Sequence, residues 1–308
     1  MKGLIYKSTG SWYLVKDEEG TFYEARLKGI FKIDGITSTN PIAVGDQVEL
    51  EFSNEGETMI RNILPRHNYI ARSSPHHISQ HHIIAANLDQ AILFSSLKNP
   101  KTSLGFIDRF LATAEAFHIP AVIFFNKSDL YQKKEMQQYQ HIEKMYGSLG
   151  YPVLLMSVSG LSGIEETKKF FENKTSLISG NSGVGKSSFI NYLAPGLNLK
   201  TLEVSQWSGK GMHTTTFAEM HDIQGFQNAK IIDTPGLREF GMADMDKQEI
   251  SHYFPEMRNR LQDCRFNNCL HIDEPGCAIK DAVEKEEIYM DRYVSYLKIM
   301  DSINKKAY

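Results

Sequence analysis

A glycine-rich octapeptide in the second half of the chain constrains the fold more than any other feature. Residues 180–187 read GNSGVGKS, the pattern of a P-loop, in which glycines let backbone N–H groups curl around phosphate oxygens. The apolar run before it, Ser176 to Ser179, predicts a strand, and Ser188 to Leu193 predicts a helix whose N-terminus favours an anion. This order predicts an α/β fold with a nucleotide at one edge of the sheet.

The P-loop pattern also predicts individual roles. We expect Lys186 to contact the β- and γ-phosphates of the nucleotide and the hydroxyl of Ser187 to bind Mg²⁺. The full set of expected phosphate-binding residues is Gly180, Asn181, Ser182, Gly183, Val184, Gly185, Lys186, Ser187 and Ser188.

Apolar runs separated by helix-length segments predict a parallel sheet with helices on both faces, beginning near Asn87. The other expected strands are Gln90–Ser95, Ala121–Phe125, Val153–Ser157 and Ala229–Ile232. Because ligands bind at the carboxyl ends of the strands in such sheets, we expect the loops after these strands to converge on one site.

The loop after Ala121–Phe125 predicts guanine specificity. Its residues, Asn126, Lys127, Ser128 and Asp129, resemble the Asn-Lys-x-Asp motif of GTPases. The carboxylate of Asp129 can accept both the N1–H and the exocyclic amine of guanine, whereas adenine offers no such pair of donors. We expect Lys127 to pack along the base or the P-loop, Asn126 to tie the loops together, and Ser157 to lie near the guanine oxygen.

Two later segments predict residues that sense Mg²⁺ and the γ-phosphate. Asp233 ends an expected strand and is predicted to hold Mg²⁺ through water, while the N–H of Gly236 is predicted to sense the γ-phosphate. In the glycine-flanked segment 209–216, we expect Thr215, in preference to Thr214, to complete the Mg²⁺ shell in the GTP state.

Leu237 occupies the position at which Ras-like GTPases place the glutamine that orients the attacking water. We therefore expect slow intrinsic hydrolysis that a partner must stimulate. The predicted catalytic residues are Lys186, Thr215 and His213, with His213 the candidate to orient water. An equally good interpretation is that His213 contacts RNA or packs within its loop.

The order of the motifs differs from that of Ras-like chains, which begin with the P-loop and have the guanine motif near the end. Here Asn126–Asp129 and Ser157 precede Gly180, so the sequence predicts a circularly permuted GTPase. Since all the motifs lie on loops at one sheet edge, a permutation can move the chain ends and preserve the site.

The first seventy residues alternate short β-rich runs with turns, which is typical of a small barrel. The expected strands are Gly3–Tyr6, Ser11–Val15, Thr21–Leu27, Gln47–Phe52 and Thr58–Ile63. We favour an oligonucleotide/oligosaccharide-binding (OB) fold, and an SH3-like barrel is the alternative. Residues 66–86 are expected to be a polar linker whose histidines, including His77 and His81, are solvated.

Three cysteines and a histidine cluster near the C-terminus as Cys264, Cys269, His271 and Cys277. Three thiolates and one imidazole form a complete tetrahedral set for Zn²⁺ with no open position, so we predict one structural metal. A helical tail, roughly Lys280 to Asn304, is expected beside it. The module has a short core, so its folding is expected to depend on the metal.

Composition is that of an ordinary globular protein, with 41% hydrophobic residues, 23% charged residues and a formal net charge of −3 over 308 residues. A charge so near zero gives no general electrostatic attraction to nucleic acid, so any RNA-binding surface must be a local patch. Neither a long apolar span nor a signal-peptide pattern is present in the sequence, and we expect a cytoplasmic protein without membrane association.

Together these motifs resemble the ribosome small-subunit-dependent GTPase A family of circularly permuted bacterial GTPases. The similarity extends along the chain, from the barrel through NKSD, GNSGVGKSS, GKGMHTTT and DTPGLREF to the Cys-Cys-His-Cys module; Met212 replaces the family's usual arginine. The resemblance implies an OB-fold barrel over residues 1–70, a permuted GTPase domain over 71–244 and a zinc-binding domain with a C-terminal helix over 245–308.

The resemblance also implies a function. It implies that the chain hydrolyses GTP to GDP and phosphate, stimulated by the small ribosomal subunit, in late maturation of that subunit, and that it binds ribosomal RNA. It further implies Mg²⁺ with GTP, one structural Zn²⁺ and a monomer. Two alternatives are a GTP-dependent switch acting on another RNA, such as transfer RNA, and a module that holds GTP without turnover.

Overall fold

The computed structural model describes residues 1–10, 12–27, 41–53, 56–73, 81–197, 218–233 and 246–306. A parallel sheet lies at its centre, with β10, β9, β8, β11 and β13 in that order. The bounds are β8 (Gln90–Ser95), β9 (Ala121–Phe125), β10 (Val153–Leu155), β11 (Thr175–Gly180) and β13 (Lys230–Asp233). Every residue of β8 and β9 is buried, as expected for parallel strands covered on both faces.

Helices cover both faces of this sheet, as the sequence predicts. Apolar side chains of α1 (Leu104–Ala116) and α2 (Lys133–Ser148) pack on one face. The side chains of α3 (Ile164–Lys168) and α4 (Lys186–Leu193) pack on the other. Several expected bounds shift by one or two residues, including both ends of β11 and β13. α4 begins at Lys186, and β10 ends at Leu155, so Ser157 lies beyond the strand in an isolated bridge with Ser162.

Five strands form the N-terminal barrel, and their pairing decides between the two predicted barrel types. They are β1 (Lys2–Ser8), β2 (Tyr13–Asp17), β3 (Phe22–Leu27), β4 (Gln47–Phe52) and β5 (Thr58–Ile63). The strands close in the order β1-β2-β3-β5-β4-β1, with β3 and β5 parallel. This closed five-stranded arrangement confirms the OB-like barrel.

A strand that the sequence analysis did not identify joins the barrel to the parallel sheet. β12 (Glu219–Asp222) pairs antiparallel with β13 on one side and with β1 on the other. A single sheet of eleven strands therefore runs from β10 to the barrel. β12 has the sequence EMHD, whose polar residues give no recognisable strand pattern.

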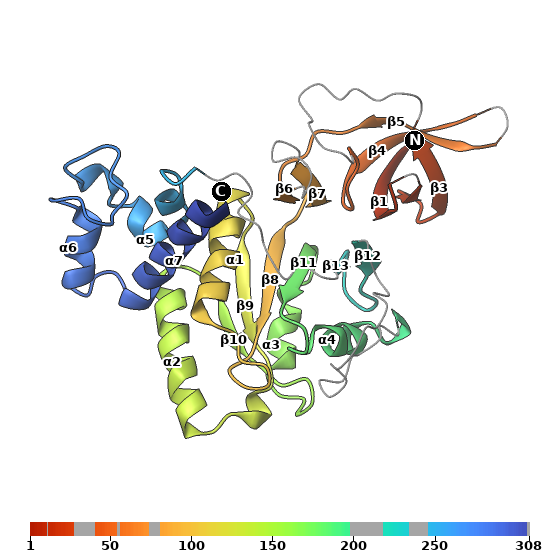
Figure 1. The fold of residues 1–308 in the computed structure, drawn as a ribbon. Coiled ribbons are helices and arrows are strands. Elements are labelled where there is room, and N and C mark those ends of the chain that lie inside the picture. Colours follow the sequence, from red (N-terminus) through yellow and green to blue (C-terminus); the bar gives the residue numbers. More distant parts are fainter. Residues whose placement is uncertain are drawn as a thin grey trace.

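The linker expected at residues 66–86 is wrong, because this segment contains a β-hairpin. β6 (Tyr69–Ser73) pairs antiparallel with β7 (His81–Ala86), and Figure 1 shows this hairpin between the barrel and β8. Ile70 and Ile83 are buried, so apolar residues within a histidine-rich segment provide the packing. His77 lies outside the described residues, as does the side chain of His81.

The C-terminal region is helical. It contains two short 3₁₀ turns, η3 (Ile250–Tyr253) and η4 (Leu261–Asp263), and three α-helices, α5 (Pro255–Arg258), α6 (Ala278–Glu284) and α7 (Met290–Lys306). The expected single tail is thus two helices, separated where Glu286 adopts the left-handed conformation (φ 59°). α7 lies along α1 of the central domain (Figure 1). No helix in the described part of the chain is long and apolar enough to cross a bilayer.

Candidate nucleotide site and metal centre

The P-loop joins β11 to α4 and has a backbone that only glycine adopts easily. Gly180 (φ 141°) and Gly185 (φ 100°) both have positive φ. A Cβ atom at Gly180 would lie 2.2 Å from the carbonyl oxygen of Phe94, so β11 can approach β8 this closely only with glycine there. Lys186, the first residue of α4, donates hydrogen bonds from Nζ to the carbonyl oxygens of Gly180 (2.7 Å) and Asn181 (2.9 Å).

Asn126 connects the P-loop to two other loops of the site. Its Nδ2 donates to the carbonyl oxygen of Val184 (2.9 Å), and its Oδ1 accepts from the backbone N–H of Val158 (3.1 Å). The side chain is buried, and a Cβ atom at Gly185 would come within 2.2 Å of Nδ2. The loops after β9, β10 and β11, far apart in sequence, are therefore fixed relative to one another by one amide.

Asp129 lies beside Ser157, as the two motifs predict for neighbouring loops. The hydroxyl of Ser157 donates to the carboxylate of Asp129 and accepts from the N–H of Gly160 (2.8 Å). Ser128 donates its backbone N–H to the carbonyl of Met156 (3.1 Å), which connects the same loops again. These contacts place a carboxylate with two acceptor oxygens at the edge of the site.

Lys127 adopts the left-handed conformation (φ 67°), and its ammonium donates to the carbonyl oxygen of Asn99. Partial burial lowers the pKa of Lys127, an effect that the nearby carboxylate of Asp129 opposes. The alkyl stem therefore crosses from the guanine motif to the loop that follows β8.

Tyr131 also organises the site, and sequence reasoning missed it. Its hydroxyl donates to the carbonyl oxygen of Asn126 (2.8 Å) and accepts from the backbone N–H of Leu97 (2.9 Å). The only signal in the sequence is an aromatic residue two positions after Asp129, which by itself does not predict a contact.

The predicted magnesium residues are only partly described. β13 ends at Asp233, whose Cα pairs with that of Ile178 on β11, two residues before Gly180. Ser187 is in the first turn of α4. A carboxylate and a hydroxyl at the ends of adjacent elements are hard oxygen donors that fit Mg²⁺. His213, Thr215 and Gly236 lie outside the described residues.

The Cys3His cluster is assembled at the other end of the molecule. The ligand atoms of Cys264, Cys269, His271 and Cys277 all lie within 4.8 Å of one another, and each residue is at most 9% exposed. Nδ1 of His271 faces the sulfurs, at 3.7 Å from Cys264 and 3.3 Å from Cys277. Burial, with a smaller contribution from the neighbouring thiol of Cys277, raises the pKa of Cys269 to about 12. A divalent cation reverses this preference by stabilising thiolates, so the donor set fits one zinc ion.

Residues around the cluster hold the backbone between its ligands. Tyr293 and Tyr296 of α7 donate from their hydroxyls to the carbonyl oxygens of His271 (2.7 Å) and Leu270 (2.8 Å). The carboxylate of Glu274 accepts from the N–H groups of Leu270 (2.8 Å) and Ile272 (2.9 Å). Sequence reasoning missed all three supporting residues, because their roles depend on the path of the loop.

Comparisons with known proteins agree with this arrangement. The sequence model of the RsgA N-terminal domain matches residues 2–60, and that of the RsgA GTPase matches residues 63–243. The chain belongs to the RsgA family. As an RsgA GTPase it is a GTP hydrolase. The predicted circular permutation is confirmed by the similarity to a solved structure, YloQ, that is described as a circularly permuted GTPase.

Curated RsgA proteins are similar over nearly the whole chain. A protein of Christiangramia forsetii named small ribosomal subunit biogenesis GTPase RsgA is 52% identical over 304 residues, which covers 98% of this chain and 96% of that protein. A Bacteroides thetaiotaomicron protein named small ribosomal subunit biogenesis GTPase RsgA 2 is 47% identical over 308 residues, covering 100% and 99% of the two chains.

Solved structures show the same overall fold. YjeQ from Thermotoga maritima matches with a TM-score of 0.79 and 34% identity, covering 98% of this chain and 97% of YjeQ. YloQ, described as a circularly permuted GTPase, matches with a TM-score of 0.75 and 30% identity, covering 99% and 95% of the two chains.

Proposed function

We propose that this GTPase acts in late maturation of the small ribosomal subunit, that the subunit stimulates its hydrolysis of GTP to GDP and phosphate, and that it binds ribosomal RNA. The observation that carries the proposal is the near full-length similarity, at 52% and 47% identity, to proteins named for biogenesis of that subunit. The joined loops around Asn126 support it, because they form a site suited to a guanine nucleotide.

Nucleotide binding is assigned to the loops at the carboxyl edge of the sheet. Lys186 would exchange its bonds to two carbonyl oxygens for the β- and γ-phosphates, and Asp129 would accept the two N–H donors of guanine. The proposed nucleotide residues are Asn126, Lys127, Ser128, Asp129, Ser157, Gly180, Asn181, Ser182, Gly183, Val184, Gly185, Lys186, Ser187, Ser188, Asp233 and Gly236.

Hydrolysis is assigned to positioning of groups around the γ-phosphate. Mg²⁺ would neutralise charge on the phosphates, held by Ser187, Thr215 and, through water, Asp233. His213 would orient the attacking water, because Leu237 cannot. A variant carrying His213→Ala is then expected to bind nucleotide and to lose stimulated turnover; full stimulated turnover would remove His213 from this role.

The Cys3His cluster is proposed to hold one structural Zn²⁺ through Cys264, Cys269, His271 and Cys277. All four donors come from the protein, so no position remains for a substrate. We further propose that the chain works as a monomer in the cytoplasm, divided into a barrel (1–70), a permuted GTPase domain (71–244) and a zinc-binding domain (245–308). The first of these boundaries lies inside β6.

Exposed aromatic side chains make the barrel a proposed contact for ribosomal RNA. The guanidinium of Arg26 lies 3.7 Å from the centroid of the Trp12 ring, and Trp12 and Phe22 are 42% and 47% exposed. Aromatic rings and arginine planes are surfaces on which unpaired bases stack.

Turnover of GTP measured with the protein alone, with small subunits and with large subunits tests the proposal. Stimulation by small subunits only, abolished by Lys186→Ala, is the expected result. Equal rates under all three conditions would overturn it. In a fourth reaction with transfer RNA, stimulation that small subunits do not produce would favour the alternative of a switch acting on another RNA.

A further inference from the structure

The strand β12 lies between two parts of the chain assigned to nucleotide sensing. It follows residues 198–217, which contain Thr215, and it precedes β13, which ends at Asp233. Its other edge pairs with β1 of the barrel. Any displacement of β12 therefore affects both the barrel and the strand that carries Asp233.

A row of paired residues crosses the sheet at this point. Lys7 of β1 pairs with Glu219 of β12, and Glu219 pairs with Asp233 of β13. Side chains of residues paired in this way project from the same face, with Cβ atoms roughly 4.5–5.5 Å apart. Nζ of Lys7 lies 3.0 Å from the carboxylate of Glu219, so a cation of the barrel offsets a negative charge next to Asp233.

A second set of contacts on the opposite face of β12 attaches it to the barrel again. The carboxylate of Asp222 accepts from the hydroxyl of Tyr6 (2.7 Å) and from Nζ of Lys16 (2.6 Å). Burial by itself would raise the pKa of Asp222, but these two hydrogen bonds hold it below its ordinary value. The strand is thus held to β1 and β2 through side chains on both of its faces.

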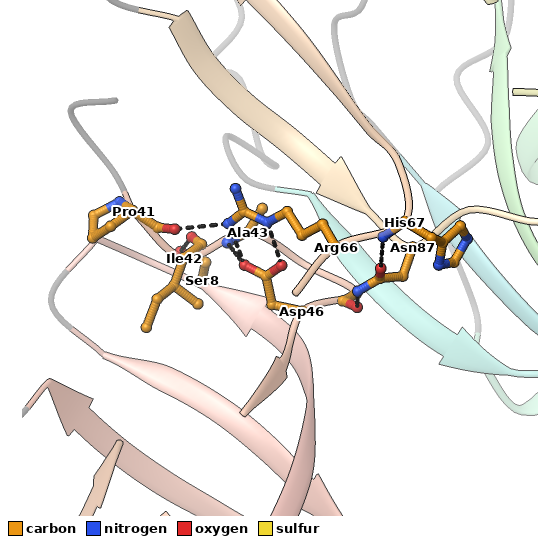
Figure 2. A network of polar contacts seen from close by, with 9 residues as sticks. Ser8, Pro41, Ile42, Ala43, Asp46, Arg66, His67 and Asn87 are labelled. Atoms are coloured by element: carbon orange, nitrogen blue, oxygen red, sulfur yellow. Dashed lines mark hydrogen bonds and ion pairs between the residues drawn. The ribbon is translucent and has the colours of Figure 1, made fainter. Parts of the chain in front are cut away.

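The barrel is attached a second time, to the chain segment between β7 and β8, and Figure 2 shows the polar contacts around this attachment. The guanidinium of Arg66 makes two hydrogen bonds of 2.6 Å to the buried carboxylate of Asp46. Asn87, just after β7, donates from Nδ2 to the carbonyl oxygen of Gly45 (2.9 Å) and accepts from the N–H of His67. A Cβ atom at Gly45 would lie 2.1 Å from the carbonyl oxygen of Ala86, so this joint is closely packed.

We propose that β12 transmits the position of the barrel to the nucleotide site, and that Lys7, Glu219 and Asp222 are positioning residues in this coupling. The inference rests on the proposed function, because it explains how RNA bound to the barrel controls a site on the other side of β12. Because Gly45 is held against Ala86 and Asn87, a force on the barrel moves its other attachment, β12, relative to β8 and β11. Thermodynamic reciprocity then requires the nucleotide to change the affinity of the barrel for its partner by the same factor.

Affinity for small ribosomal subunits, measured with GDP and with a non-hydrolysable GTP analogue, tests the coupling. In the wild type we expect the two affinities to differ by about fivefold or more. In Lys7→Ala and Asp222→Asn we expect this ratio to approach one, with nucleotide affinity in the absence of subunits measured in parallel as a check of folding. The double variant that exchanges the two charges, Lys7→Glu with Glu219→Lys, retains the ion pair and is expected to keep the wild-type ratio of affinities.

Lys168→Ala is the matched control, because Lys168 forms a comparable surface ion pair with Glu165 (2.7 Å) on α3, and it should keep the wild-type ratio. An unchanged ratio in both β12-contact variants overturns the inference and leaves the proposed function intact. Equal loss of affinity in both nucleotide states also overturns it, because Lys7 would then only contact RNA. If small subunits neither bind nor stimulate the wild type, the proposed function fails, and the inference fails with it.

Discussion

Asn126 joins three loops of the nucleotide site through two hydrogen bonds, and Gly185 leaves the space that its amide occupies. The motif predicts that an asparagine stands here, but only the tertiary contact with Val184, 58 residues away, shows what it holds. Removing a buried partner costs about 1–3 kcal/mol for each group left without a hydrogen bond.

Asn126→Ala is therefore expected to lower affinity for GDP by at least about tenfold, since about 1.4 kcal/mol corresponds to a factor of ten. Titration with a fluorescent GDP derivative measures this. Asn267→Ala, on an exposed loop of the C-terminal region, is the control and should bind as the wild type does. An equal affinity in both variants would mean that the loops hold their arrangement without the amide.

Arg292 is a buried cation that joins α7 to the central domain. It donates to Asp108 of α1 (2.6 Å) and to Glu256 of α5 (2.6 Å), and Tyr146 donates to the same oxygen of Asp108 (2.7 Å). Burial raises the pKa of Asp108 although Arg292 lies beside it, so removal of the arginine would leave carboxylates without compensation.

Arg292→Ala is expected to reduce the free energy of unfolding by about 3–5 kcal/mol. Arg258→Ala removes an exposed ion pair with Glu115 and should cost no more than about 1 kcal/mol. Urea unfolding of the two variants compares these costs directly. Similar values would show that the buried network does not hold α7 in place.

At the scale of elements, α7 connects the metal cluster to the central domain. Its arginine contacts α1, while the hydroxyls of Tyr293 and Tyr296 hold the backbone of the ligand loop. The region has a small core that includes the three cysteines, and such modules commonly require the metal to fold.

His271→Ala is expected to abolish binding of one equivalent of zinc and to lower the unfolding temperature. Removal of the metal from the wild type with a chelator should lower the unfolding temperature in the same way. His252→Ala changes an exposed histidine of the same region and should keep the zinc content and the unfolding temperature of the wild type. Metal content by atomic emission and thermal unfolding provide the measurements. A fully folded, metal-free wild type would contradict the structural role of the cluster.

At the scale of the whole molecule, the barrel and the central sheet form one continuous hydrogen-bonded sheet. The exposed residues Trp12 and Arg26 lie on the barrel and are far in sequence from the loops of the nucleotide site. If phosphate contacts dominate the interface with RNA, affinity for small subunits must fall steeply as salt is added, because bound counterions are released.

We expect Trp12→Ala to weaken binding to small subunits by about fivefold or more, the loss expected for one stacked base. Tyr192→Ala, which removes an exposed aromatic residue of α4, is the control and should bind normally. Binding of the wild type and the two variants to small subunits, measured over a series of salt concentrations, gives the effect of each substitution and the salt dependence of the affinity. A response independent of salt would argue against an interface dominated by RNA.

Local pattern explains which elements the sequence alone predicts. β4, β5, β8 and β9 have the expected bounds, because their apolar or alternating residues follow the period of a strand. The P-loop, the permuted order of the motifs and the Cys3His set are likewise determined by residue type and spacing, since backbone freedom and donor chemistry are local properties.

Only the tertiary structure decides how these parts are joined. β12 is short and rich in polar residues, and the β6–β7 hairpin lies in a histidine-rich segment, so strand pairing rather than sequence pattern identifies them as strands. Lys7 and Glu219 are 212 positions apart, and Arg292 and Asp108 are 184 apart. Charged residues carry no periodic signal for their partners, so these ion pairs exist only because the fold brings distant elements together.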